Sequence, residues 1–402
     1  MGNDVNGRGD ACGGRDAGGD VGVTAPPVWG DEVESTLVCR AVQQITPDVR
    51  SFLFAPTEPA IFRHAAGQFL TLRLMFEGRA VSRCYTISSP PTRPDLIGIT
   101  VKRQPGGLVS NWLHDTMEPG VRLAADGPFG TFTREHSGGA SNDGVAGPAY
   151  LFLSGGSGAT PLMSMTRAAF DLAADDDIVY VHSARTPADI LFRRELELMT
   201  NLAPNITVHH LCEHDAPGER WGGFTGRLDA DRLRVLVPDL HRREIFCCGP
   251  APYMAGVREL LGELEFDMAR YHEETFVFED LSVGEFVPDG CAADLLDGAD
   301  GTVDPAAAQA AAARVGGYTV EFVRTGASFP CGPDEHILDA AYAAGLAPSS
   351  SCGRGMCGTC KVTILSGTVD MNHQGGIRPR EIAANKVLIC CSTPTSDVAI
   401  EA

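Results

Sequence analysis

The most informative stretch of this sequence is Cys352-Gly-Arg-Gly-Met-Cys357-Gly-Thr-Cys360, and a further cysteine, Cys390, follows it after 29 residues. The spacing Cys-x4-Cys-x2-Cys gathers three thiols on one short loop. The glycines between them allow positive φ angles and let backbone N–H groups approach sulfur atoms closely. Arg354 adds a positive charge beside the thiols. The pattern indicates either a metal centre or covalent pairing of the sulfurs.

Three kinds of site are consistent with these four cysteines. Plant-type [2Fe–2S] clusters use this spacing, with a fourth cysteine farther along the chain. Zinc sites usually contain two Cys-x2-Cys pairs, whereas this stretch has one. Disulfides require an oxidising compartment, which nothing in the sequence indicates. We therefore predict a [2Fe–2S] cluster with Cys352, Cys357, Cys360 and Cys390 as its ligands.

The fourth ligand has to be chosen from two neighbours, Cys390 and Cys391. Cys390 lies four residues before Pro394, and this segment resembles the last ligand segment of plant-type ferredoxins. We expect Cys391 to point the other way along a strand, because successive side chains of a strand alternate in direction. A cluster of this kind carries one electron at a time, so the rest of the chain is expected to supply the electrons.

Length and composition limit the possible functions. The chain has 402 residues, 44% of them apolar, and a formal net charge of −20, which predicts two to four domains. No apolar run reaches membrane-spanning length and the N-terminus lacks an apolar core region, so we expect no membrane segment, no secretory signal and a cytoplasmic location. Residues 1–35 and 279–317 carry −5 and −7 of the charge. No basic stripe is present, so we expect no nucleic-acid partner.

The composition and the local patterns divide the chain into five segments. Residues 1–34 are rich in Gly, Asp and Asn and are predicted to be a disordered acidic tail. Residues 35–136 contain six short strands (36–42, 49–54, 68–75, 80–88, 97–102 and 121–125) and a helix (108–115), which predicts an antiparallel β-barrel. Strands and helices alternate over residues 148–279, with one of the helices predicted over 189–200, and this alternation predicts a doubly wound α/β domain. Residues 280–317 form a predicted flexible linker. Residues 318–402 are predicted to be an α+β domain, of the β-grasp type by resemblance to plant-type ferredoxins.

One predicted strand of the barrel contains Arg83-Cys-Tyr85-Thr86, which combines a cation, an aromatic ring and a hydroxyl group. Tyr85 could stack on a flat, electron-poor ring, Thr86 could hydrogen-bond a ring nitrogen and Arg83 could reach a diphosphate. Taken alone, the same residues also make an ordinary β-strand.

Two further segments accompany this strand. Gly106-Gly107 leads into a helix N-terminus, where free N–H groups and the helix dipole suit a diphosphate. Gly127-Pro128-Phe129-Gly130 is predicted to be a tight turn that closes the barrel. The three segments, in this order, resemble the FAD domain of the ferredoxin–NADP reductase family, whose pattern is Arg-x-Tyr-Ser/Thr, Gly-Gly-x-x-Ser and Gly-Pro-x-Gly. The resemblance implies bound FAD and the following binding residues: Arg83, Tyr85, Thr86, Ser88, Val101, Lys102, Gly107, Leu108, Val109 and Ser110.

The α/β region carries two matching segments of the same family. Ligands of such sheets bind beyond the carboxyl ends of the strands, where the glycine turn 154–161 and the segment 248–250 are expected to lie. The resemblance to the nicotinamide half of the family implies these dinucleotide-binding residues: Gly155, Gly156, Gly158, Thr160, Cys248, Gly249 and Pro250. Thr160 and Cys248 would flank the nicotinamide ring. Without the resemblance, Cys248 would be interpreted as a small, buried apolar residue. The segment 271–276 resembles the part that approaches the flavin, which implies Glu274 and Phe276.

The choice of coenzyme depends on the residues after the strand 178–181. Arg185 could contact a 2′-phosphate, or merely the adenosine or the diphosphate. No cluster of two basic groups with a serine is present. We therefore predict NADH in preference to NADPH.

The order of a flavin, a nicotinamide and a C-terminal ferredoxin domain resembles the reductase components of bacterial two-component oxygenases over residues 36–402. The segment 371–382 is most similar to reductases serving Rieske-type demethylases of glycine betaine and related quaternary amines, and hybrid-cluster-protein reductase follows closely. The resemblance implies an NADH-dependent oxidoreductase that passes electrons singly to a terminal oxygenase or another acceptor protein. Two alternatives are a non-catalytic redox carrier or sensor, and a self-contained oxygenase, for which the sequence lacks a second metal motif.

Overall fold

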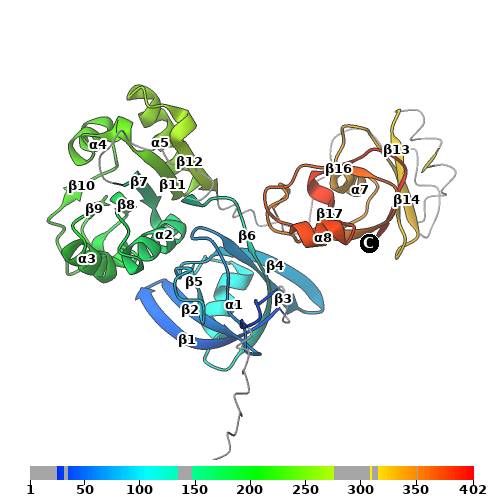
Figure 1. The fold of residues 1–402 in the computed structure, drawn as a ribbon, viewed down its shortest axis with the longest axis horizontal. Helices are drawn as coiled ribbons and strands as arrows, with labels where there is room; N and C mark the ends of the chain where they lie inside the picture. Colours follow the sequence, from blue (N-terminus) through cyan, green and yellow to red (C-terminus); the bar gives the residue numbers. More distant parts are fainter. Residues whose placement is uncertain (1–24, 31–34, 135–146, 276–307, 310–315, 351) are drawn as a thin grey trace, which may run out of the picture.

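The computed structural model describes residues 25–30, 35–134, 147–275, 308–309, 316–350 and 352–402. They form the three domain types predicted from the sequence, namely an antiparallel barrel, a parallel α/β domain and a smaller α+β domain (Figure 1). Residues 1–24 and 31–34 of the predicted tail lie outside the described residues. Most of the predicted linker, 280–317, lies outside them as well.

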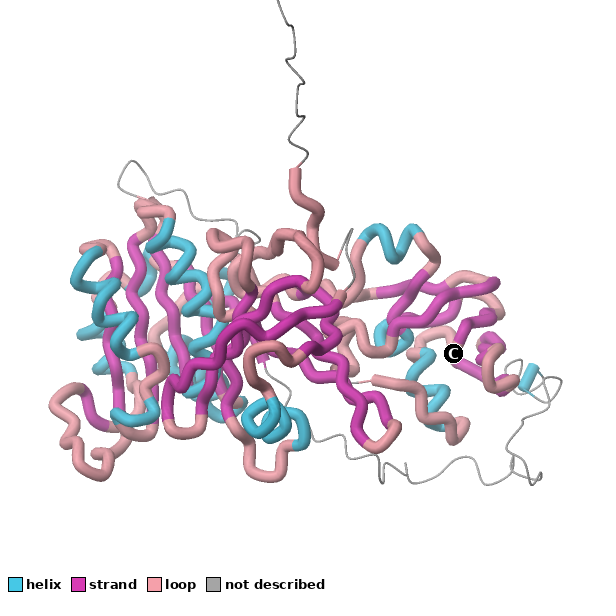
Figure 2. The backbone as a smooth tube through the Cα atoms, turned by 90° about the horizontal axis from the view of Figure 1, so that it is seen from below, coloured by secondary structure: helices cyan, strands magenta, loops and turns pink. Residues whose placement is uncertain are grey.

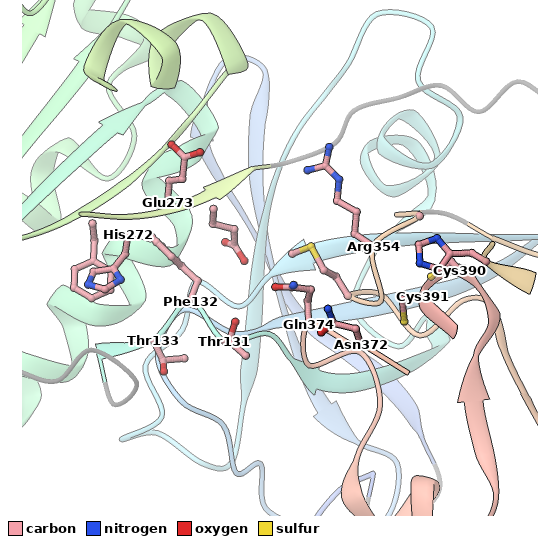
Figure 3. Close-up of a pocket in the computed structure, with 15 residues that line it drawn as sticks. Thr131, Phe132, Thr133, His272, Glu273, Arg354, Asn372, Gln374, Cys390 and Cys391 are labelled. Carbon is pink, nitrogen blue, oxygen red and sulfur yellow. The ribbon is translucent and has the colours of Figure 1, made fainter. Parts of the chain in front are cut away.

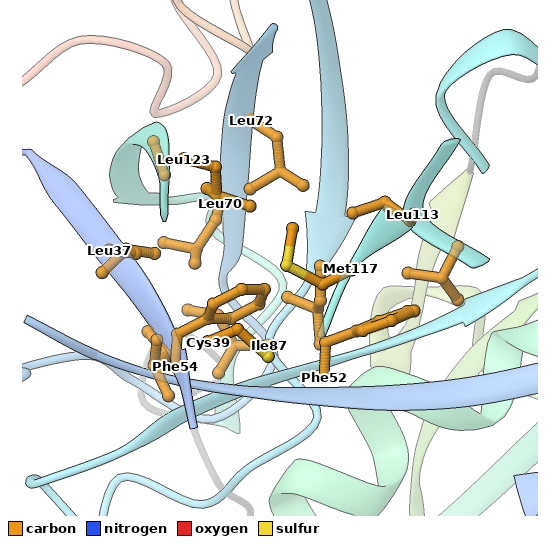
Figure 4. Close-up of a cluster of buried hydrophobic side chains, with 14 of the residues drawn as sticks. Leu37, Cys39, Phe52, Phe54, Leu70, Leu72, Ile87, Leu113, Met117 and Leu123 are labelled. Atoms are coloured by element: carbon orange, nitrogen blue, oxygen red, sulfur yellow. The ribbon is translucent and has the colours of Figure 1, made fainter. Parts of the chain in front are cut away.

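The first domain is a sheet of six antiparallel strands in the order β4-β3-β6-β1-β2-β5. Its elements are β1 (Thr36–Thr46), β2 (Val49–Pro56), β3 (Phe69–Phe76), β4 (Arg79–Thr86), β5 (Ile97–Lys102), α1 (Leu108–Thr116) and β6 (Arg122–Phe129). A bridge between Ile87 and Ile99 connects the end of β4 to β5 and closes the barrel. Phe52 and Phe54 occupy alternate positions of β2, so both fill the interior (Figure 4).

Residues 25–30 differ from the predicted disordered tail, because they pack against the barrel. Val28 forms a bridge with Ile61, and the Trp29 N–H donates a 2.9 Å hydrogen bond to the Ile61 oxygen. The Trp29 side chain is 1% exposed, and its ring centroid lies 5.2 Å from that of Phe62. The composition argument was wrong for these residues because one large aromatic side chain can anchor a short segment.

The second domain is a parallel six-stranded sheet in the order β10-β9-β8-β7-β11-β12. Its elements are β7 (Ala149–Gly155), η2 (Gly156–Gly158), α2 (Ala159–Asp171), β8 (Asp177–Ala184), η3 (Pro187–Asp189), α3 (Arg193–Leu202), β9 (Ile206–Cys212), β10 (Phe224–Thr225), α4 (Ala230–Leu236), η4 (Leu240–Arg242), β11 (Glu244–Gly249), α5 (Ala251–Glu263), η5 (Met268–Arg270) and β12 (Tyr271–Thr275). Helices cover both faces of this sheet (Figure 2). The central strands β7 and β11 are therefore buried along their whole length, which explains their continuous apolar sequence.

Two local predictions in these domains were wrong. The helix predicted over 189–200 begins only at Arg193, because Phe192 has a φ of +56° and interrupts the helical backbone. The predicted turn at 127–130 is largely strand, since β6 continues to Phe129 and pairs it with Phe69.

The third domain contains a mixed sheet in the order β14-β13-β19-β15-β17 and a two-stranded sheet of β16 and β18. Its elements are β13 (Tyr318–Phe322), β14 (Ala327–Cys331), α7 (Ile337–Ala343), β15 (Lys361–Ser366), β16 (Val369–Met371), α8 (Pro379–Ala383), β17 (Lys386–Leu388), η6 (Ile389–Cys391), β18 (Ser392–Pro394) and β19 (Val398–Glu401). Its core packs α7 against the sheet through side chains such as Ile337, Phe329 and Ile400. This core supports the loop that carries Cys352, Cys357 and Cys360.

Helix α2 joins the first two domains. The Ser164 hydroxyl donates a 2.7 Å hydrogen bond to the Ser89 oxygen, and the Arg167 guanidinium donates one of 2.6 Å to the Ser88 oxygen. Both acceptors follow directly after β4. The strand with the predicted flavin residues and the helix after the glycine turn are therefore held together.

Candidate functional site

The four predicted cluster cysteines come together in one connected group of sulfur atoms. The Cys357 sulfur contacts that of Cys352, and the Cys390 sulfur contacts those of Cys352 and Cys360. The Cys352 sulfur also accepts hydrogen bonds from the backbone N–H groups of Met356, at 3.2 Å, and Cys357, at 3.3 Å. Four thiols gathered in one place supply the four ligands that two bridged irons need. Within the described ranges, no three His, Cys, Asp or Glu side chains are grouped to hold a single metal ion.

The crowding of these sulfur atoms changes their acidity. The pKa of the Cys357 thiol is raised by three causes. In order of size, these are contact with the Cys352 sulfur, contact with the Cys84 sulfur and burial. Contact with Cys390, followed by burial, raises the pKa of the Cys360 thiol. Thiolates packed this closely need a nearby positive charge, which a metal centre provides.

Cys390 and Cys391 have different partners. The Gly355 N–H donates a 3.2 Å hydrogen bond to the Cys390 sulfur, whereas the Cys391 thiol donates to the Leu388 oxygen at 3.5 Å. The two cysteines lie in the 3₁₀ turn η6 and not in the expected strand. Because a 3₁₀ turn has about three residues per turn, consecutive side chains still point in different directions.

Strand β4 carries Arg83, Tyr85 and Thr86 in the predicted places. Tyr85 is half-buried and packs against the barrel core. Arg83 is also half-buried, and its guanidinium donates a 2.8 Å hydrogen bond to the Ser82 oxygen. Thr86 is buried, and its hydroxyl makes no hydrogen bond of ordinary geometry within the described part of the protein, although it lies near the Glu274 carboxyl group. Since an unpaired buried hydroxyl costs free energy, this position fits contact with a bound polar ring.

Three other predicted flavin-binding residues have side chains that already contact other parts of the protein. The Ser88 hydroxyl lies 2.8 Å from that of Thr100. The Val101 side chain is buried in the barrel core, and Lys102 forms a 3.3 Å ion pair with Asp48. These residues can therefore offer a ligand mainly their backbone groups.

The segment from Gly107 to Ser110 forms the N-terminus of α1. Gly107 is the N-cap residue and no side chain caps this helix end. A Cβ atom on Gly107 would lie 2.6 Å from the Ser110 hydroxyl, so the tight approach requires glycine. Leu108 is exposed and Val109 is buried. The uncapped N–H groups fit the predicted diphosphate.

The two predicted nicotinamide segments lie on neighbouring strands, because Ser154 of β7 pairs with Cys248 of β11. A Cβ atom on Gly158 would lie 2.1 Å from the Cys248 oxygen, and one on Gly249 would lie 2.7 Å from the Tyr253 ring. Gly155 also faces the Tyr253 ring, and Gly156 has a φ of +51°. Pro250 is exposed and is the N-cap residue of α5. The two loops therefore depend on glycine to approach each other.

Thr160, Cys248 and Glu274 line the junction of the first two domains. Thr160 is buried and its hydroxyl donates to the Ser157 oxygen at 3.2 Å. Cys248 of β11 is the strand partner of Glu274 of β12. The pKa of the Cys248 thiol is raised, first by burial and second by the Glu274 charge. The pKa of Glu274 is raised to about 8, mainly by burial and to a smaller extent by the nearby Cys84. The neighbouring Thr86 hydroxyl has the opposite effect and lowers this pKa. The Glu274 carboxyl group can therefore hold a proton near neutral pH. Its Oε2 atom has no hydrogen-bond partner among the described residues.

The last two predicted residues stand apart from this junction. Arg185 follows β8, is 66% exposed and forms a 3.3 Å ion pair with Asp189. Phe276 lies outside the described residues.

An open cavity of about 610 Å³ separates the cluster loop from the α/β domain. Figure 3 shows His272, Glu273 and Phe132 on one side and Arg354, Gln374 and Cys390 on the other. Of the predicted cofactor-binding residues, only Glu274 and Cys390 line it.

Sequence reasoning missed the contacts between the cluster loop and the barrel. The Thr71 hydroxyl donates a 2.7 Å hydrogen bond to the Cys357 oxygen and lies 3.5 Å from the Cys84 sulfur. Cys84 sits between two predicted flavin residues, contacts Cys357 and lies near enough to Glu274 to affect the pKa of its carboxyl group. Strand periodicity could have placed it on the same face as Thr86, but no motif marked Thr71.

Three family descriptions match the chain. An oxidoreductase FAD-binding domain matches residues 36–134, an oxidoreductase NAD-binding domain matches 152–259, and a 2Fe-2S iron-sulfur cluster binding domain matches 321–395. They assign FAD, a nicotinamide dinucleotide and a [2Fe–2S] cluster to the three domains.

The chain is also similar to complete reductase subunits. It is 44% identical to the glycine betaine monooxygenase reductase subunit of Pseudomonas aeruginosa, over 90% of this chain and 94% of that protein. It is 36% identical to the stachydrine N-demethylase reductase subunit of Rhizobium meliloti, over 93% of this chain and 98% of that one. The cytochrome b5 reductase domain of Ulva prolifera nitrate reductase shares the fold of the first two domains, with 22% identity and a TM-score of 0.54 over 62% of this chain and all of that one. None of the helices in the described part of the chain has the length and apolar character needed to cross a lipid bilayer.

Proposed function

This chain belongs to the ferredoxin–NADP reductase-like family and has FAD-binding, NAD-binding and C-terminal 2Fe-2S domains, and from this we propose its function. We propose that the chain oxidises NADH and delivers the electrons one at a time to a terminal oxygenase. Bound FAD accepts an electron pair and releases electrons singly, and the cluster carries one electron at a time. The protein positions these groups relative to one another.

One observation carries this proposal, namely the convergence of all three domains on strand β4. Thr86 of this strand lies beside Glu274 of the α/β domain, and Cys84 contacts Cys357 of the cluster loop. The strand with the proposed flavin residues thus borders both the side that supplies electrons and the side that receives them. Transfer over such short distances needs no diffusing carrier.

We assign roles to the predicted residues on this basis. Tyr85 stacks on the flavin ring, Thr86 hydrogen-bonds it, and Arg83 with the N-terminus of α1 binds the diphosphate. Thr160 and Cys248 flank the nicotinamide. The four cysteines identified above ligate the cluster. We also retain the domain limits 35–136, 148–279 and 318–402 as part of the proposal.

NADH is the proposed coenzyme. Arg185, the candidate for binding a 2′-phosphate, is already paired with Asp189. The negative charge of Asp189 beside it disfavours an additional phosphate. We place the reaction in the cytoplasm, because none of the eleven cysteines in the described ranges forms a disulfide.

The proposed acceptor is a Rieske-type oxygenase that demethylates glycine betaine or a related quaternary amine. The support comes from the two similar reductase subunits, whose names refer to oxygenation of glycine betaine and demethylation of stachydrine. Hybrid-cluster protein is the alternative acceptor.

An anaerobic titration of the purified protein with NADH, followed by visible absorbance, tests the proposal. We expect loss of flavin absorbance followed by loss of cluster absorbance, and oxygenase turnover when glycine betaine demethylase is added. The Cys357→Ser variant should retain NADH-driven reduction of small dyes and lose transfer to the oxygenase. Flavin and cluster bands that ignore NADH and NADPH alike would instead support a carrier or sensor.

A further inference from the structure

The C-terminal domain contacts the barrel at a second place, about the segment 127–130. The Arg378 guanidinium donates hydrogen bonds to the Gly127 oxygen and, at 2.6 Å, to the Gly30 oxygen. Its Cζ atom also lies 5.5 Å from the centroid of the Phe129 ring. One side chain of the cluster domain therefore binds two backbone oxygens and an aromatic ring of the barrel domain.

Lys361 reinforces this contact from the same domain. Its ammonium group lies 5.3 Å from the Phe129 centroid, so Phe129 has two cations near its ring. Glu381 fixes both cationic residues, because it accepts a 2.6 Å hydrogen bond from the Lys361 ammonium and a 2.9 Å bond from the Arg378 backbone N–H. Cation–π contacts of this kind are favourable and become stronger as the pair is removed from water.

The same region brings the two backbones close together. A Cβ atom on Gly375 would lie 3.3 Å from the Gly130 nitrogen, and Gly375 has a φ of +86°, so this close approach favours glycine. Phe129, which both cations approach, is 2% exposed. The contact is therefore a packed interface.

This interface orients the cluster loop. Arg378 and Lys361 bind Phe129 of β6, and β6 pairs with β3, which carries Thr71. Thr71 donates its 2.7 Å hydrogen bond to the Cys357 oxygen. Binding at Phe129 thus places a cluster ligand against the strand pair β3–β4, next to Cys84.

We propose that Arg378 is a positioning residue that holds the cluster loop at the Thr71–Cys357 contact for electron transfer from the flavin domain. This inference rests on the proposed function. Oxidation of one NADH to NAD⁺ yields two electrons and one proton, and the electrons cross this contact one at a time. A cluster held by the four cysteines would accept a single electron and pass it to the outside acceptor protein.

The test compares full-length Arg378→Ala with wild type and with Arg324→Ala as a matched control. Arg324 lies in the same domain and pairs with Glu401 of that domain at 2.9 Å. In anaerobic stopped-flow experiments with NADH, we expect all three proteins to reduce the flavin at the same rate. Cluster reduction should be slowed in Arg378→Ala alone, by about 10–100-fold, because small misplacements of reacting groups carry penalties of this size.

Two further readouts separate positioning from damage to the cluster. The electron paramagnetic resonance spectrum of the chemically reduced cluster should be unchanged in Arg378→Ala. Its radius of gyration by small-angle X-ray scattering should increase, because the domains are no longer held together. Cluster reduction at the wild-type rate, or an unchanged radius, would overturn the inference.

A second variant covers the case in which Arg378→Ala fails to assemble its cluster. Thr71→Val removes only the hydroxyl that donates to Cys357 and keeps the side-chain shape. We expect slower cluster reduction with normal flavin reduction, and a wild-type rate in this variant would overturn the inference. If wild-type flavin does not respond to NADH, the proposed function itself fails.

Discussion

The Thr71 hydroxyl donates a 2.7 Å hydrogen bond to the backbone oxygen of Cys357, which lies 286 positions later in the chain. Both groups are buried. A buried hydrogen bond of this kind contributes about 0.5–1.5 kcal/mol, and losing one partner costs more. It fixes the cluster loop relative to the barrel and places the electron donor and acceptor domains within contact distance.

The adjacent cysteines Cys390 and Cys391 provide a matched pair for testing the ligand set. We expect Cys390→Ala to lose the cluster, because its sulfur contacts those of Cys352 and Cys360. Cys391→Ala should retain it, since the Cys391 thiol bonds the Leu388 oxygen. Iron content and visible absorbance of the purified variants measure the result. Cluster loss in Cys391→Ala combined with retention in Cys390→Ala would reverse the assignment.

Glu274 should make the stability of the protein depend on pH. Its pKa is raised from 4.5 to about 8 in the folded state, so the folded protein holds a proton that the unfolded chain releases. The free energy of unfolding should therefore fall as the pH rises through this range, by up to about 1.4 kcal/mol per pH unit.

The Glu274→Gln variant should lose this dependence. Glu273→Gln is the control, because Glu273 lies on the same strand, is exposed and pairs with Arg258. Urea unfolding at about pH 5 and about pH 8 compares the proteins. Parallel pH profiles for wild type and Glu274→Gln would show that the carboxyl is ionised in the folded protein.

The contact between the glycine turn and Cys248 predicts a severe effect of Gly158→Ala. The added Cβ would lie 2.1 Å from the Cys248 oxygen, so the two loops must separate at a cost of about 1–3 kcal/mol. NADH-driven flavin reduction should fall while the cluster remains. Gly256→Ala is the control, because a Cβ there meets no atom within 4 Å and should raise helix stability by about 0.5–1 kcal/mol. Stopped-flow kinetics with normal NADH affinity in Gly158→Ala would refute the proposed binding turn.

The coenzyme preference follows from the charge around Arg185. Because Asp189 already pairs with Arg185, we expect kcat/KM for NADH to exceed that for NADPH by about tenfold or more, which corresponds to about 1.4 kcal/mol. Steady-state dye reduction with each coenzyme measures the ratio. A preference for NADPH would mean that Arg185 exchanges Asp189 for the 2′-phosphate.

Trp29 should stabilise the barrel domain. Its side chain is 1% exposed and packs against Phe62, so Trp29→Ala should lower the free energy of unfolding by about 3–5 kcal/mol. Met75→Ala is the control, since Met75 is 66% exposed and should change stability by less than about 0.5 kcal/mol. Equal thermal unfolding midpoints for the two variants would contradict the packing of residues 25–30.

The local patterns predicted most of the architecture. The strand 97–102 was placed with its exact limits, and the helix expected over 108–115 extends one residue farther, to Thr116. The errors occurred where a single residue changed the backbone, as Phe192 does at the start of α3. A left-handed φ at a phenylalanine has no reliable sequence signal.

The sequence by itself determined the chemistry that each domain can support, because cysteine spacing, glycine turns and the Arg-x-Tyr-Thr strand are local properties of the chain. Only the tertiary structure decided which of these groups meet. Cys84, Glu274 and Cys357 come from three domains, and their proximity depends on side chains such as Thr71 and Lys361 that belong to no motif. Long-range packing sums many weak interactions between distant residues, so it leaves no short pattern in the sequence.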